Sequence, residues 1–291
     1  MTTKRRDAFQ QVVTDAINDL LEFGFDSQER LDRWTQRLEQ AARASLVPES
    51  VLDRSLRDML LRVYERTVDN DRLIQRHKGI SQFTLASIKP KLRGELDRRI
   101  LASANLIRLN REASIQKTIQ RFSGWATSIP TGQRGEGWWS DVEDRTEIKA
   151  AVRKGIAGLP FEERRVIIDQ GHKLAASINE IVAIDGGAIG GFWHHVKEGG
   201  GYQARPEHEK RDGKFYLLRD SWAIQKGYIR KGSVPYYDTI TAVGQEVYCR
   251  CWMTWIFNLR DIPQECMTRK GEEALAEARQ RIAGWSNESR I

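Results

Sequence analysis

The residues of this chain best suited to bind a metal ion are two cysteines and three histidines. Cys249 and Cys251 are separated by one residue, and they are preceded by His194, His195 and His208. Residues i and i+2 of a β-strand face the same side, so a strand here would present both thiols to one ligand. Thiolate and imidazole groups are the usual ligands of tetrahedral zinc. His208, Cys249 and Cys251 therefore form a candidate structural zinc site, with one of the other histidines as a further ligand.

Burial without a metal is the alternative interpretation of these cysteines. Cysteine is among the most buried residue types and packs as a small apolar side chain. Paired cysteines of common zinc modules are separated by two to four residues, whereas Cys249 and Cys251 are separated by one. The chain has 3 cysteines in all, which cannot make a disulfide framework. Under this interpretation the two thiols only pack the last strand.

A catalytic interpretation assigns the same segment to phosphoryl transfer, as in a nuclease. His208 would act as general acid or base, while Arg205 and Lys214 would stabilise charge on phosphate oxygens. The sequence contains no Walker A, His-Glu-x-x-His or Gly-x-Ser-x-Gly motif. The sequence therefore favours a protein without catalytic activity over an enzyme.

A sequence-independent nucleic-acid-binding protein is a third interpretation. Aromatic residues such as Tyr216, Trp222 and Tyr228 are interleaved with basic residues after position 197. Aromatic side chains can stack on bases while the basic residues contact phosphates. The same aromatic residues would also supply the core of a small domain.

The elements that must position these residues change in type along the chain. Apolar residues recur at helical spacing through 1–122, including a long helix from near Pro90 to about Phe122. A segment rich in Gly, Ser and Pro, 123–140, predicts a linker loop. Helices are predicted at 141–157 and 161–182, strands at 214–218 and 246–256, and a helix with a polar tail at 259–291. The predicted fold class is α+β, a long helical N-terminal part followed by a small mixed α+β C-terminal domain.

Positive charge is concentrated on the long N-terminal helix. The net charge of the 291-residue chain is +7, and the segment 80–125 alone has nine basic and three acidic residues. A solvated outer face is the commoner explanation of such charges, and a face that contacts the phosphates of double-stranded DNA is the alternative. The candidate DNA-contacting residues are Arg93, Arg98, Arg99, Arg108, Arg111 and Lys117.

The order of motifs in the C-terminal part resembles that of a known family. Trp193 is followed by Arg205-Pro206-Glu207-His208, by Asp212-Gly213-Lys214 and finally by Cys249-Arg250-Cys251. This series resembles the phage Mu protein F-like family of minor head proteins, over about 160–258. Members of that family commonly have Asn before the first Cys of the last motif, whereas this chain has Tyr248.

The resemblance implies a head-morphogenesis protein of a tailed phage, with 141–258 as the family domain. Such a protein associates with the portal protein and with capsid or scaffold proteins. It is packaged in the procapsid and contacts double-stranded DNA during packaging or ejection. The resemblance places it in the host bacterial cytoplasm during assembly, and afterwards in the virion interior or at the portal vertex. The sequence has no apolar run of the ~18 residues that a membrane span requires.

Overall fold

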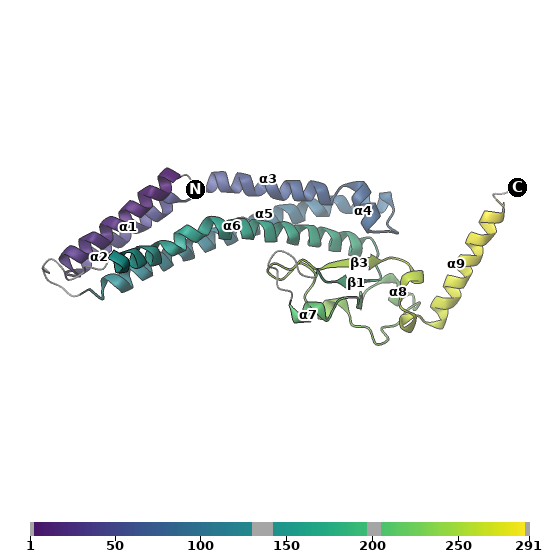
Figure 1. The fold of residues 1–291 in the computed structure, drawn as a ribbon. Helices are drawn as coiled ribbons and strands as arrows, with labels where there is room; N and C mark the ends of the chain where they lie inside the picture. Colours follow the sequence, from purple (N-terminus) through teal and green to yellow (C-terminus); the bar gives the residue numbers. More distant parts are fainter. Residues whose placement is uncertain (1–2, 130–141, 197–204, 289–291) are drawn as a thin grey trace. The chain divides into compact units, whose positions relative to one another are not determined.

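The computed structural model describes residues 3–129, 142–196 and 205–288 (Figure 1). Its residues form two compact units, and neither unit is one continuous stretch of chain. Unit 1 comprises Met1–Asp58 and Ile100–Ile168, and unit 2 comprises Met59–Arg99 and Asp169–Ile291. The predicted α+β class is confirmed, because a helical N-terminal part is followed by a small antiparallel sheet with short helices.

The described residues of unit 1 form helices and the turns between them. Unit 1 contains α1 (Thr3–Phe23) and α2 (Gln28–Ser45), together with parts of α3 (Glu49–Thr67), α5 (Gln82–Ala126) and α6 (Val142–Asp185). The side chain of Ser27 caps α2 by accepting a hydrogen bond from the backbone N–H of Arg30. Apolar residues at helical spacing form one buried core, whose fully buried members include Ile17, Leu20, Leu38, Phe122 and Ile156. Burial of these stripes stabilises the bundle.

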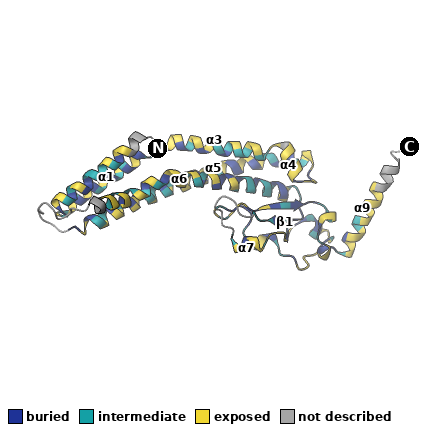
Figure 2. Cartoon of the chain, viewed as in Figure 1, coloured by how far each residue is buried: buried dark blue, intermediate teal, exposed yellow. Residues whose placement is uncertain are grey.

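Unit 2 combines helix ends with the sheet. It contains the C-terminal end of α3, the short helix α4 (Asn70–Arg76), the N-terminal part of α5 and the C-terminal part of α6. The strands β1 (Gly190–His194), β2 (Phe215–Leu217) and β3 (Trp252–Ile256) form an antiparallel sheet in the order β2-β1-β3. Short helices α7 (Pro206–Glu209) and α8 (Trp222–Gln225) lie between the strands in sequence, and α9 (Arg269–Glu288) follows them. Figure 2 shows that most described residues of α9 are exposed.

Two long helices extend past the boundaries that the sequence predicts. α5 begins at Gln82 rather than near Pro90 and ends at Ala126, so 123–126 is helix rather than linker. α6 is one helix through Pro160, not two. A proline within a helix costs about 3 kcal/mol. Burying an aliphatic side chain contributes about 1.5–3 kcal/mol, and several buried residues flank each proline, which offsets that cost. Residues 130–141 of the predicted linker lie outside the described residues.

The strands agree in part with the sequence. The strand predicted at 214–218 is confirmed as β2, but the strand predicted at 246–256 is confined to Trp252–Ile256. Residues 246–251 form turns and irregular structure instead. The central strand β1 was not predicted. In the described part of the chain, no helix has both the length and the apolar character needed to cross a membrane.

Candidate metal centre

Three of the predicted metal ligands lie together in unit 2. His208 belongs to α7, while Cys249 and Cys251 lie in the irregular segment that leads into β3. Only 1% of His208, 2% of Cys249 and 5% of Cys251 is exposed to solvent. Their ligand atoms all lie within 4.8 Å of one another. Among the described residues this is the one such cluster of His, Cys, Asp and Glu side chains.

The distances within this cluster fit tetrahedral zinc. His208 Nδ1 is 3.7 Å from Cys249 Sγ and 3.5 Å from Cys251 Sγ. Zn–S bonds of ~2.3 Å and Zn–N bonds of ~2.05 Å at the tetrahedral angle separate sulfur from nitrogen by about 3.6 Å. The imidazole of His208 is therefore placed relative to both sulfurs as a zinc ligand would be, and all three ligand atoms lie within 4.8 Å of one another.

The neighbouring histidines 194 and 195 have different surroundings. His195 follows β1, and its Nδ1 lies 3.8 Å from Cys251 Sγ, but His195 is not within 4.8 Å of all three ligand atoms of the cluster, so its ring would have to move closer to act as a fourth ligand. His194 stacks on Trp252 at a ring-centroid distance of 4.1 Å and shares a 2.9 Å hydrogen bond between its Nε2 and Thr254 Oγ1. Alternation of side chains at the end of the strand thus places only His195 beside the cluster.

A carboxylate fixes the orientation of the His208 ring. Its Nε2 lies 3.3 Å from Glu246 Oε1, and Glu246 is held in turn by Arg205 Nε at 3.0 Å. Arg205 also donates to the backbone carbonyl of Val247 at 2.9 Å. Donation from Nε2–H leaves the lone pair of Nδ1 directed toward the sulfurs, the arrangement found for histidine ligands of zinc. The sequence analysis missed Glu246, because a lone Glu within a predicted strand has no metal-site signature.

Electrostatics favour one thiolate in the pair of cysteines. The hydrogen bond from the Cys251 thiol and the backbone amides of Gly244 and Cys251 lower the pKa of Cys249 to about 5, against the opposing effect of burial. The pKa of Cys251 is raised, because its thiol donates to Cys249 and because it is buried. The hydrogen bond from His208 and the charge of Arg205 outweigh desolvation and lower the pKa of Glu246. A cation would displace the proton that the two sulfurs share.

A strained turn, not a strand, brings the two cysteines to His208. Tyr248 has a φ of 60° and is the one described residue other than glycine with a positive φ. Its backbone N–H donates to Asp169 Oδ1 at 2.6 Å, which ties the turn to α6. Gly244 also has a positive φ, and a Cβ there would lie 2.6 Å from Ala176 Cβ of α6. The turn therefore passes close to α6 and reverses just before Cys249.

The other residues of the family-like motif hold the cluster in place. Trp193 is fully buried, and its ring centroid lies 5.5 Å from that of His208. The backbone N–H of Gly213 donates to the Trp193 carbonyl at 2.8 Å, and Asp212 Oδ1 accepts from the His195 N–H at 2.9 Å. Gly213 has a φ of 71°, which glycine adopts without strain. Arg250 and Lys214 are exposed.

The six candidate DNA-contacting residues do not form one free basic face. Arg111 is buried and pairs with Glu163, and it donates to the Val47 carbonyl at 2.8 Å. Arg99 pairs with the buried Glu95 at 3.0 Å, so both arginines serve packing rather than an exposed surface. Among the others, Arg98 also pairs with Glu95, Arg93 with Asp97, and Arg108 with Asp53, whereas Lys117 is exposed.

Comparisons with known proteins yield no relative of this chain. No family model matches the sequence, no curated protein is similar to it, and no solved structure matches its fold. The resemblance to the phage Mu protein F-like family therefore depends on the motif residues and on what they do in the structure.

Proposed function

We propose that this protein is a minor head protein of a tailed phage, active in head morphogenesis at the portal, and that a structural zinc ion stabilises its C-terminal part. The ligands are His208, Cys249 and Cys251, with His195 as the fourth. One observation carries the proposal. Most of the motif residues, spread over positions 193–251, lie in or beside one buried His/Cys cluster, whereas Lys214 and Arg250 are exposed.

Burial of His208 favours this architectural role over catalysis. A general acid or base must reach the substrate, but only 1% of His208 is exposed and both ring nitrogens face protein groups. Arg205 is engaged by Glu246 and Val247, and Lys214 is exposed outside the cluster. Contact with double-stranded DNA stays a prediction for the exposed Arg93, Arg98 and Lys117.

Metal analysis tests the zinc site. We expect protein purified without chelator to contain about one zinc ion per chain. Cys251→Ser should lose the metal and lower the melting temperature, because it removes a buried ligand. Cys266→Ser is the matched control, since Cys266 is also fully buried but lies outside the cluster. Metal-free wild-type protein, or equal zinc loss in both variants, would contradict the site.

Association with the portal tests the phage role. The full chain would be co-expressed with the portal protein of the same phage and analysed by size-exclusion chromatography with multi-angle light scattering. We expect the two proteins to elute together at a fixed ratio. Separate elution, combined with cleavage of plasmid DNA by the chain alone, would contradict the proposal and favour a nuclease.

A further inference from the structure

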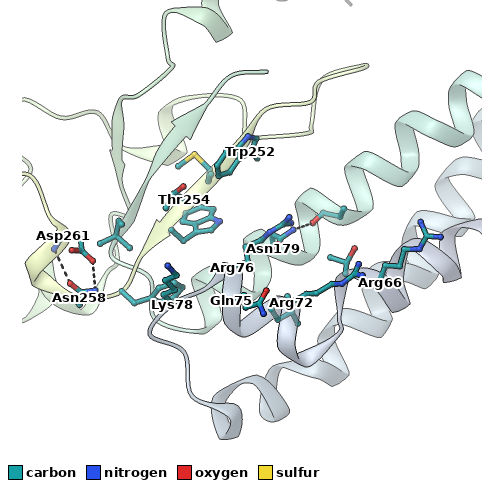
Figure 3. A pocket seen from close by; sticks show the side chains of 17 residues that line it. Arg66, Arg72, Gln75, Arg76, Lys78, Asn179, Trp252, Thr254, Asn258 and Asp261 are labelled. Carbon is teal, nitrogen blue, oxygen red and sulfur yellow. Dashed lines mark hydrogen bonds between the residues drawn. The ribbon is translucent and has the colours of Figure 1, made fainter. Parts of the chain in front are cut away.

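A pocket in unit 2 gathers unpaired positive charge (Figure 3). Its volume is about 720 Å³, and its walls come from the end of α3, from α4 and the residues after it, from α6, and from β3 with the segment after it. Asp261 is the acidic residue of its lining. The basic side chains of the lining, here called the pocket cations, are Arg66, Arg72, Arg76 and Lys78.

The pocket cations are available to a ligand. All four are exposed, and within the described part of the chain none of them forms an ion pair with an acidic side chain. The carboxylate of Asp261 is already engaged, since it accepts hydrogen bonds from Asn258 at 2.9 Å and from Arg260 at 3.2 Å. Four like charges around one cavity repel one another, and an anion bound there would relieve that repulsion.

An exposed indole lies on the β3 side of the same pocket. Trp252 is 51% exposed, although a tryptophan is normally mostly buried. His194 covers part of the ring by stacking at 4.1 Å with an interplanar angle of 20°, and Thr254 holds His194 through a hydrogen bond. The ring is therefore held in a fixed orientation, and Trp252 lines the cavity. Such a surface suits stacking of a planar group.

Anionic groups and a planar ring occur together in a nucleotide. We propose that this pocket binds single-stranded nucleic acid, with backbone phosphates at the pocket cations and a base stacked on Trp252. A single strand is favoured over a duplex, because its bases are free to stack on an aromatic side chain while those of a duplex are already stacked. An acidic peptide would use the cations but would gain nothing specific from the indole. The inference is independent of the zinc site and of the phage role.

Fluorescence anisotropy with the full chain and labelled dT12 tests the proposal. Arg66→Gln with Arg72→Gln should weaken binding. The slope of log K against log salt is negative and should become shallower by about 1.4, since each phosphate contact on a single strand contributes about 0.7 to its magnitude. Arg54→Gln with Arg57→Gln is the matched control, because it removes two exposed charges from α3 outside the pocket. Trp252→Leu should weaken binding about tenfold through loss of stacking. Circular dichroism would show that each variant is folded.

Competition experiments separate the sources of the ligand. A 12-base-pair duplex and a poly-glutamate peptide should each compete less well than unlabelled dT12. Competition by dTMP as strong as that by dT12 would overturn the strand as ligand and assign the pocket to a free nucleotide. Equal loss of binding in the pocket and control double variants, or unchanged binding in Trp252→Leu, would overturn the proposed site.

Discussion

The two nitrogens of the His208 ring have separate tasks. Nδ1 faces both sulfurs, while Nε2 faces Glu246, which Arg205 holds in turn. The Arg-x-x-His spacing of the motif suits this arrangement, in which Arg205 and His208 both contact Glu246. Arg205 lies directly before α7 and His208 within it, so both reach the same carboxylate. In the proposed zinc site Glu246 would therefore act on the metal only through His208, as a positioning residue.

Removing that carboxylate should weaken metal binding without removing a ligand. We expect Glu246→Gln to lower zinc affinity by about 10–100-fold, the usual effect of losing the carboxylate partner of a histidine ligand. Competition with a chromogenic chelator would measure the change. Glu207→Gln is the control, since Glu207 is an exposed residue of α7, next to His208 in sequence. Equal affinities for the two variants would show that Glu246 does not support the site.

Strain at Tyr248 gives a second prediction for a single residue. Its φ of 60° lies in the left-handed region, which disfavours most side chains but which Asn tolerates. We expect Tyr248→Asn to be more stable than Tyr248→Ala by about 0.5–1 kcal/mol, because both remove the ring and only Asn suits the backbone. Chemical denaturation of the two variants would measure the difference. An Ala variant as stable as the Asn variant would argue against a strained turn.

Packing between α5 and α6 in unit 1 depends on one glycine. A Cβ at Gly155 would lie 3.0 Å from the backbone carbonyl oxygen of Ser114 and 3.0 Å from Thr118 Oγ1. A Cβ at Gly158, one turn later in α6, would meet nothing within 4 Å. The sequence predicts two separate helices here, 141–157 and 161–182, with Gly158 between them and Gly155 near the end of the first. The structure shows that Gly155 instead allows the two helices to approach closely.

The same substitution at both positions should therefore have unequal effects. We expect Gly155→Val to be less stable than Gly158→Val by about 1–3 kcal/mol, the usual cost of overpacking a close contact. Because the helix propensity of valine is the same at both sites, the difference in the free energy of unfolding reports the contact. Equal free energies of unfolding for the two variants would show that the close contact at Gly155 can accommodate a larger side chain without loss of stability.

Strand β1 shows where sequence reasoning fails at the scale of an element. Gly190 and Gly191 begin the strand, and glycine is depleted in strands, so the sequence gives no strand signal there. A Cβ at Gly190 would lie 2.5 Å from the Tyr216 carbonyl oxygen, and one at Gly191 would lie 2.9 Å from Met253 Cε. Close neighbours on both sides of this central strand require glycine, and those neighbours are distant in sequence.

Stability of the whole molecule should fall in mild acid because of His77. The ring is fully buried, and burial lowers its pKa to about 4, with a further contribution from Arg76. Nε2 lies 3.0 Å from Asn179 Oδ1, whereas Nδ1 has no hydrogen-bond partner among the described residues. Protonation of Nδ1 would therefore place a charge in the core without an acceptor.

The direction of the pH effect follows from the two states. Below pH ~6.5 the unfolded chain binds a proton at this histidine that the folded chain does not bind until about pH 4. We expect His77 to remove about 2 kcal/mol of stability between pH 7.5 and pH 5. Urea denaturation of wild type and His77→Gln would measure it. The variant should lose less stability over that range, and parallel pH profiles would contradict the prediction.

The fold class of the molecule could be predicted from the sequence, but its division into two units could not. Helical spacing of apolar residues in the N-terminal part and strand patterns in the C-terminal part are local signals, and they predicted an α+β protein correctly. The partition into two units was not predicted, because each unit combines stretches that lie far apart in the chain. Likewise, the thiols of Cys249 and Cys251 lie near each other, but not for the predicted reason. Their sulfurs meet through the Tyr248 turn, not through the alternation of a strand.

Burial of the metal ligands has a consequence for exchange kinetics. With at most 5% of His208, Cys249 or Cys251 exposed, a chelator in solution cannot reach a bound ion directly. In the proposed site, a bound ion would leave when the segment around Tyr248 moves away from α7. Above a modest chelator concentration, the rate of metal release should therefore become constant and equal the rate of that opening. The limiting rate of metal release would then measure how often this part of the protein opens.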